Sequence, residues 1–258
     1  LRTEGALTPG HPEFGHTPGV ELTTGPLGTG LASAVGFAMA ERFTHGLLDP
    51  DTPHGQSIFD HCVYVIAGDG CLQEGVSAEA SSLAGTQKLG NLIVLWDDNR
   101  ISIEGDTDIA FSEDVLKRYE SYGWHVQRVD WLSEDGSYVE DVHALDEALE
   151  AARDNTDQPS IIALRTIIGW PTPEKSNTGG IHGAKLGEEA LRGLKLALGA
   201  DPDAHFAVDE EAVAHSRKQF AQRAQTLRDQ WNQRFEQWRK VNPDRAALLE
   251  RLRQGGLP

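Results

Sequence analysis

Residues 68–75 read Gly-Asp-Gly-Cys-Leu-Gln-Glu-Gly and directly follow an apolar run, residues 62–67. A segment of helical character comes next. A second apolar run, residues 92–96, then ends at Asp-Asp-Asn-Arg-Ile, residues 97–101. Continuous apolar runs of this length are typical of strands that are covered on both faces, as in a parallel sheet. The stretch therefore predicts two neighbouring parallel strands, with polar side chains placed just beyond the end of each.

The rest of the chain extends this alternation of strands and helices. Two further strands are expected at residues 124–129 and 159–164, and helices are expected from residue 28 onward and at residues 75–89, 112–122 (with Ser112 as a plausible cap), 142–152 and 188–198. Alternating strands and helices predict a three-layer α/β/α domain with a mostly parallel sheet, which we assign to residues 1–200. Residues 209–240 are highly charged and carry one apolar stripe, so we predict an extended helix there and assign residues 201–258 to a helical segment after the α/β domain.

Asp69 and Asn99 are the candidate metal ligands. They follow adjacent predicted strands, at the edge where open parallel sheets bind ligands. Carboxylate and amide oxygens suit a hard divalent cation, Mg²⁺ or Ca²⁺, and Ile101 could add its main-chain carbonyl. These protein ligands are too few to enclose a cation. A bound phosphate or diphosphate is therefore expected to complete its coordination shell. The alternative is that Asp69 and Asn99 only cap helices.

A glycine-rich turn, Gly25-Pro26-Leu27-Gly28-Thr29-Gly30, precedes the first predicted helix. Glycines let a ligand approach the backbone closely, and a helix N-terminus favours negative charge. A dinucleotide fingerprint does not fit, because Ser33 stands where a glycine is needed and no buried strand precedes the turn. A P-loop does not fit either, since no Gly-Lys-Ser/Thr follows. A simple packing turn is the remaining alternative.

Composition narrows the partners and the compartment. The chain of 258 residues carries 23 basic and 40 acidic residues, a net charge of −17. This charge argues against nucleic acid and against acidic membrane surfaces as partners. The two cysteines, Cys62 and Cys71, show no zinc-binding spacing and indicate reduced thiols in a cytoplasmic protein. No signal peptide and no apolar run long enough to cross a bilayer are found.

Gly-Asp-Gly with an asparagine 30 residues after the aspartate resembles the cofactor motif of thiamine-diphosphate enzymes. Four further segments resemble transketolase in order and separation: Gly-His-Pro-Glu at residues 10–13, Thr-Thr-Gly-Pro-Leu-Gly at 23–28, Ser-Ser-Leu-Ala-Gly-Thr at 81–86 and Ile-His-Gly-Ala at 181–184. The similarity runs along the whole chain. It departs at Thr29, where transketolases usually have glutamine.

The resemblance implies an activity and a set of site residues. Transketolases transfer a two-carbon ketol unit from a ketose phosphate to an aldose phosphate in the pentose phosphate pathway, using thiamine diphosphate. By the same resemblance His11 and His182 are catalytic. The cofactor-binding residues would be Gly25, Pro26, Leu27, Gly70, Asn99 and His182, and the ligands of Mg²⁺ or Ca²⁺ would be Asp69, Asn99 and Ile101. The seven histidines at 45, 54, 61, 125, 143, 205 and 215 are expected to be surface or structural groups.

The resemblance also implies a homodimer in the complete protein, with Glu74 and Glu79 near the subunit interface. It implies that the chain is a fragment, because transketolases carry a piece before this region and two domains after it. Residues 1–200 would be the N-terminally incomplete diphosphate-binding domain, and residues 201–258 the helical linker to a missing domain. The activating glutamate and the main phosphate-binding arginines would then lie elsewhere, so we expect the fragment alone to be inactive. Two alternatives stay open. One is a sister enzyme, dihydroxyacetone synthase or, less favoured by residues 10–13 and 181–184, deoxyxylulose-phosphate synthase. The other is a binding module without catalysis.

Overall fold

The computed structural model describes residues 3–103 and 105–256. The contacts divide the chain into two units, Leu1–Met39 with Cys62–Ala200, and Ala40–His61 with Asp201–Pro258. The break after residue 200 falls where the sequence predicts the linker to begin, whereas residues 40–61 group with the second unit. The assignment of residues 1–200 to one cofactor-binding domain stays a prediction.

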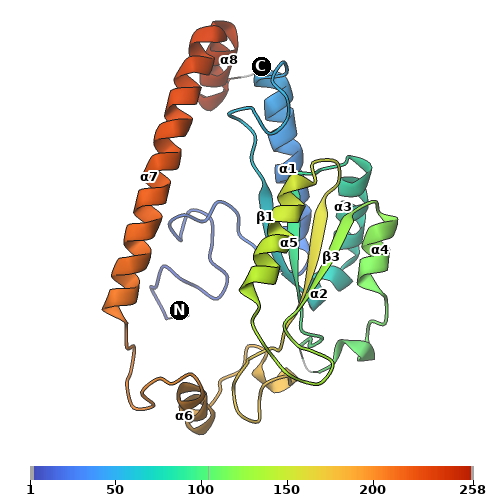
Figure 1. Ribbon diagram of the computed structural model, residues 1–258, viewed down its shortest axis with the longest axis vertical. Helices are drawn as coiled ribbons and strands as arrows, with labels where there is room; N and C mark the ends of the chain where they lie inside the picture. Colours follow the sequence, from blue (N-terminus) through green and yellow to red (C-terminus); the bar gives the residue numbers. More distant parts are fainter. Residues whose placement is uncertain (1–2, 104, 257–258) are drawn as a thin grey trace. The chain divides into compact units, whose positions relative to one another are not determined.

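The first unit is built on a parallel sheet of four strands (Figure 1). The strands are β1 (Val63–Gly68), β2 (Leu92–Asp98), β3 (His125–Asp130) and β4 (Ser160–Arg165), in the order β1-β2-β4-β3. All three pairings are parallel. The predicted α/β class and the four predicted strands are therefore confirmed, with shifts of one or two residues at their ends.

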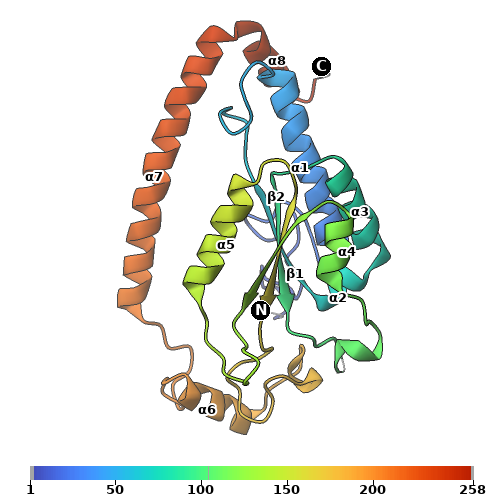
Figure 2. The ribbon, with the colours of Figure 1, turned by 45° about the vertical axis from the view of Figure 1, so that its right-hand side comes forward.

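Helices cover the two faces of this sheet, which makes the three layers visible in Figure 2. One face packs against the start of α1 (Thr29–Leu48), α3 (Gly75–Thr86) and α4 (Val115–Ser121). The opposite face packs against α5 (Val142–Asp154), whose Ala148 and Ala152 meet strand residues such as Ile162. Small alanines on the helices let them approach the sheet closely, and each layer completely buries one of the neighbouring side chains Ile161 and Ile162 of β4.

The edge strand β1 departs from the expectation that it would be covered on both faces. Val65 and Ala67 are buried, but Tyr64 and Ile66, which point to the opposite side, are 49% and 82% exposed. Side chains alternate between the two faces of a strand. The layer containing α5 covers the middle of the sheet and leaves this face of β1 open within the described residues. An apolar run alone does not show whether both faces of an edge strand are buried.

The predicted helix at residues 112–122 starts later than expected. Helix α4 begins at Val115, and its N-cap is Asp114, whose side chain accepts a hydrogen bond from the Lys117 backbone N–H at 3.2 Å. Ser112 is therefore not the cap. Aspartate and serine are both good N-caps, and local sequence does not choose between nearby candidates.

The second unit contains the helical segment predicted at the C-terminal end, as α7 (Glu210–Val241) and α8 (Pro243–Arg253). The indole N–H of Trp231 donates to the backbone carbonyl of Ile58 at 3.1 Å, and Trp238 packs edge-on against Phe59. Arg245 forms an ion pair with Asp51 at 3.1 Å. These contacts explain why residues 40–61 group with the C-terminal helices.

The remaining elements are short. They are α2 (Asp69–Gln73), α6 (Glu188–Ala197) and two 3₁₀ turns, η1 (Thr107–Ile109) and η2 (Gly179–Ile181). Among the helices of the described residues, none combines the length and the apolar character that a membrane span requires.

Candidate active site

The ends of β1 and β2 bring the two predicted metal ligands together. Gly68 pairs with Asp97 in the parallel register, so the residues that follow each strand leave the sheet at the same edge. One carboxylate oxygen of Asp69, Oδ2, accepts hydrogen bonds from the backbone N–H groups of Asn99 at 3.2 Å and Arg100 at 3.0 Å. The carboxylate is thus held against the start of the loop after β2.

The amide of Asn99 is fixed within the same loop. Its Oδ1 accepts a hydrogen bond from the Ile101 backbone N–H at 2.9 Å, and its Nδ2 donates to Asp97 Oδ2 at 2.9 Å. Arg100 between them has a positive φ of 61°, which turns the backbone sharply. Carboxylate, amide and main-chain carbonyl oxygens are the donor set of Mg²⁺ and Ca²⁺ sites, so the residues present fit a hard divalent cation.

Burial changes the acidity of Asp69, which is only 8% exposed. Desolvation, with a smaller contribution from the negative charge of Asp98, raises the pKa of Asp69 to about 6. Hydrogen bonds from Trp96, Arg100 and Asn99 act in the opposite direction and do not cancel the rise. A cation beside this carboxylate would replace the lost solvation and favour the ionised form.

Asp98 shares this region but faces arginines. Its carboxylate lies 3.8 Å from Arg165, 3.9 Å from Arg100 and 3.7 Å from Arg128. Burial raises its pKa, and the three guanidinium groups oppose that rise. Asp98 is therefore matched by three nearby guanidinium groups, whereas the hydrogen bonds to Asp69 come from neutral N–H groups.

The glycine turn lies against the same region. A Cβ added to Gly25 would sit 2.7 Å from the ring of His11, and one added to Gly70 would sit 3.1 Å from Leu27 Cδ1. The turn therefore contacts both a predicted catalytic histidine and the Gly-Asp-Gly segment. Thr29, the departure from the family pattern, donates its hydroxyl to the Pro26 carbonyl at 2.7 Å and closes the turn locally.

Gly28 explains why the turn needs glycine. Its φ is +79°, and an added Cβ would meet Ser77 Oγ at 2.8 Å and Val76 Cγ1 at 2.9 Å, at the start of α3. Both the backbone conformation and the available space exclude a larger residue.

The predicted site residues His182, Glu74 and Glu79 lie outside the hydrogen-bonded group around Asp69. His182 follows η2 and is exposed, and among the described residues no recorded hydrogen bond joins it to Asp69, Asn99 or His11. Glu74 is the N-cap residue of α3, Glu79 lies within the helix, and both are exposed. Their predicted roles stay predictions.

Sequence reasoning missed two supports of the site. The indole N–H of Trp96 donates to Asp69 Oδ1 at 3.3 Å, and the hydroxyl of Thr166 donates to Asp97 Oδ1 in a short hydrogen bond. Trp96 was visible in the sequence only as the end of an apolar run. Thr166 follows β4, and no local feature of the sequence shows that β4 lies beside β2 in the sheet.

A parallel sheet with an acid and an amide at its ligand-binding edge, beside a glycine turn, defines an α/β cofactor-binding domain. Comparison with known proteins identifies the family. Residues 1–258 match the family model described as "Transketolase, thiamine diphosphate binding domain". The chain belongs to this family.

Individual relatives agree with this assignment. The chain is 55% identical to the transketolase of Mycobacterium leprae over 258 residues, which is 100% of this chain and 36% of that protein. It is 44% identical to the transketolase of Geobacillus stearothermophilus, covering 100% of this chain and 37% of the relative. A solved structure of Pichia stipitis transketolase in complex with sedoheptulose 7-phosphate superposes with a TM-score of 0.88 at 43% identity, covering 100% of this chain and 36% of that one. The chain thus spans little more than a third of the length of these relatives.

Proposed function

We propose that this chain is the thiamine-diphosphate-binding part of a transketolase, which moves a two-carbon ketol unit from a ketose phosphate to an aldose phosphate. The observation that carries the proposal is the hydrogen bonding of Asp69 to the Asn99–Arg100 backbone. These hydrogen bonds bring together the Gly-Asp-Gly segment and the segment containing Asn99 at one edge of the sheet. The match to the family model along the chain supports the same reading.

In this proposal Asp69, Asn99 and the carbonyl of Ile101 hold Mg²⁺ or Ca²⁺, and the diphosphate completes the coordination. The cation would offset the desolvation of buried Asp69, whose hydrogen bonds come only from neutral N–H groups. Gly70 leaves room for the diphosphate to approach the backbone, because it has no side chain. The hydrogen bonds to Asp69 and Asn99 preset both oxygens, so less ordering is required when the cation binds.

Gly25, Pro26 and Leu27 are proposed to contact the thiamine part of the cofactor, and His182 contacts it from its loop. When bound, thiamine diphosphate supplies the carbanion-stabilising chemistry. His11, packed on Gly25, and His182 would orient the hydroxyl groups of the sugar and move protons, because an imidazole can donate or accept near neutral pH.

The partners follow from the same proposal. Sugar phosphates are the substrates, in keeping with the sugar-phosphate complexes of the Pichia stipitis enzyme. The complete protein would be a cytoplasmic homodimer, with exposed Glu74 and Glu79 at its interface. Because the activating glutamate would come from the partner subunit, the 258-residue chain alone is expected to be inactive.

Cofactor binding tests the proposal directly. Calorimetry would measure binding of thiamine diphosphate to the chain in the presence of Mg²⁺, for the wild type, Asp69→Ala and the control Asp157→Ala. Asp157 is exposed in the loop before β4, at the opposite edge of the sheet from Asp69. We expect binding to be lost in Asp69→Ala and kept in the control. Equal binding by all three proteins would contradict the proposed site.

Activity needs a separate experiment. Turnover of a ketose phosphate donor with an aldose phosphate acceptor would be assayed on the chain alone and on a complete protein that contains it. We expect turnover only in the complete protein. Turnover by the isolated chain would show that the division of the active site is wrong, and a different acceptor preference would favour a sister enzyme such as dihydroxyacetone synthase.

A further inference from the structure

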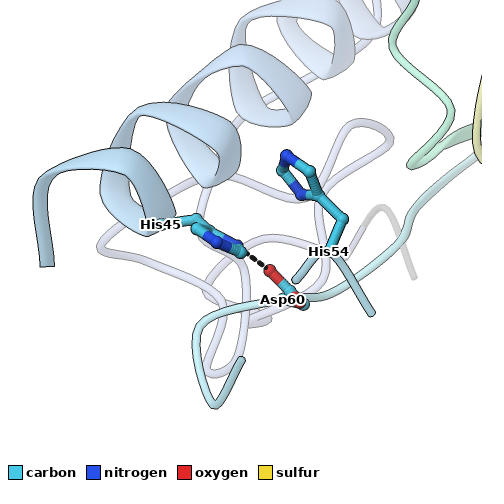
Figure 3. A group of neighbouring side chains, drawn as sticks. All are labelled: His45, His54 and Asp60. Carbon is cyan, nitrogen blue, oxygen red and sulfur yellow. Dashed lines mark hydrogen bonds and ion pairs between the residues drawn. The ribbon is translucent and has the colours of Figure 1, made fainter. Parts of the chain in front are cut away.

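A second group of potential metal ligands lies in the second unit. This group has no role in the proposed reaction. Figure 3 shows its members: His45 from α1, and His54 and Asp60 from the loop that follows. One ligand atom from each residue lies within 4.8 Å of the others. Two imidazoles and a carboxylate form the ligand set of many transition-metal sites.

The hydrogen bonds of His45 determine which ring nitrogen is available. Its Nε2 lies 2.9 Å from the backbone carbonyl of Thr52, which can only accept, so Nε2 must carry a hydrogen. Its Nδ1 faces Asp60 Oδ1 at 2.5 Å. A neutral ring in this tautomer would place a lone pair against a carboxylate oxygen. A positive species between the two atoms, either a proton or a metal ion, resolves that conflict.

The carboxylate is oriented in a similar manner. Asp60 Oδ2 accepts a hydrogen bond from the Ser57 backbone N–H at 2.9 Å, which leaves Oδ1 pointing at His45. The buried carboxyl group of Glu41 also interacts with Asp60, which contributes to the raised pKa of Glu41. Metal-binding histidines and carboxylates are commonly oriented by such outer contacts, with a backbone carbonyl on the far ring nitrogen.

His54 supplies the third ligand and the entry path. Its ring lies 4.4 Å from the His45 ring, centroid to centroid, and its side chain is exposed on the loop. Ligand atoms around a tetrahedral zinc ion are roughly 3.3 Å apart, given metal–ligand distances of about 2.0–2.1 Å. Nδ1 and Oδ1, which are 2.5 Å apart, must therefore separate by about 0.8 Å, and His54 must move inward. A residue on an exposed loop can make that adjustment.

We infer that His45 Nδ1, Asp60 Oδ1 and His54 form a site for a borderline divalent transition metal such as Zn²⁺, with water in the remaining position. Its nitrogen-rich ligand set separates it chemically from the oxygen ligands proposed for Mg²⁺ or Ca²⁺ at Asp69. The buried carboxylate of Asp49, which accepts a hydrogen bond from the Ser57 hydroxyl at 2.7 Å, adds negative charge nearby and favours a cation.

Cobalt provides the test, because Co²⁺ bound by nitrogen ligands with low coordination number absorbs visible light strongly and hydrated Co²⁺ does not. The purified chain would be titrated with Co²⁺ in excess Mg²⁺, which occupies oxygen sites, and Zn²⁺ would then be added. We expect one Co²⁺ per chain with a visible band that Zn²⁺ abolishes.

Two variants make the test specific. His54→Gln removes an exposed ligand with little risk to folding, and it should weaken Co²⁺ binding at least about tenfold, since even loss of an outer contact costs roughly 10- to 100-fold. His143→Gln, which changes an exposed histidine on α5, should bind as the wild type does. No visible band, or equal Co²⁺ affinity in His54→Gln and wild type, would show that only a proton joins His45 to Asp60 and would overturn the inference.

Discussion

Replacing Asp69 by asparagine should alter how stability depends on pH in the chain without cation or cofactor. Asparagine keeps the size and one acceptor oxygen but cannot ionise. In the folded wild type, burial raises the pKa of Asp69 to about 6, from an ordinary value of 3.8. The stabilisation that this group gives below pH 3.8 is therefore lost as the pH rises through about 6.

The size of the effect follows from the shift in pKa. Each pKa unit corresponds to about 1.4 kcal/mol, so ionised Asp69 costs about 3 kcal/mol of unfolding free energy above pH 7. At pH 5 most folded molecules hold the proton, whereas most unfolded ones do not, and linkage gives a cost of about 1.5 kcal/mol. Relative to Asp69→Asn, the wild type should therefore gain about 1.5 kcal/mol on going from pH 7.5 to pH 5.

Urea denaturation in the presence of a chelator would measure this difference. Unfolding free energies of both proteins at the two pH values give a double difference, in which other titrating groups largely cancel. A double difference within about 0.5 kcal/mol of zero, the usual spread for independent sites, would refute the argument that burial raises the pKa of Asp69. The sign of the double difference matters as well. If the wild type lost stability relative to Asp69→Asn at low pH, the pKa of Asp69 would be lowered in the folded state.

Three further substitutions test the packing that supports the site, each by urea denaturation. Gly85→Ala in α3 would place a Cβ 1.9 Å from the Tyr122 carbonyl oxygen, and it should lower the unfolding free energy by at least about 2 kcal/mol. Wild-type stability of this variant would show that the backbone at Tyr122 can move aside at little cost. Gly36→Ala in α1 meets nothing within 4 Å and should gain about 0.5–1 kcal/mol from helix propensity, so a loss would contradict the open space there. Tyr119→Phe removes the 3.0 Å hydrogen bond to Ser81 and should cost about 1–2 kcal/mol, whereas no change would mean that this buried bond contributes nothing.

Much of the first unit could be predicted because its information is local. The apolar runs of β2 and β4 lie in the middle of the sheet and are mostly buried, as their composition predicts; only Leu95 and Leu164 in these runs are half-buried. The joining of Asp69 and Asn99 could also be anticipated, because residues that follow adjacent parallel strands must meet at one edge. Spacing and sheet geometry were sufficient for both conclusions.

What could not be predicted depends on contacts between distant segments. The indole of Trp96 reaches Asp69, and residues 40–61 pack with the C-terminal helices, and neither fact has a local signature. The pairing of His45 with Asp60 is of the same kind. Each histidine alone suggested a surface or structural group, and only the folded loop places two of them beside a carboxylate.

The open face of β1 has a practical consequence for handling this chain. β1 is an edge strand of the sheet within the described residues, and it exposes the apolar side chains of Ile66 and Tyr64. Exposed apolar edges recruit strands from other molecules and lead to aggregation. A charged residue blunts such an edge, so Ile66→Lys should raise the concentration at which the isolated chain stays dispersed on storage.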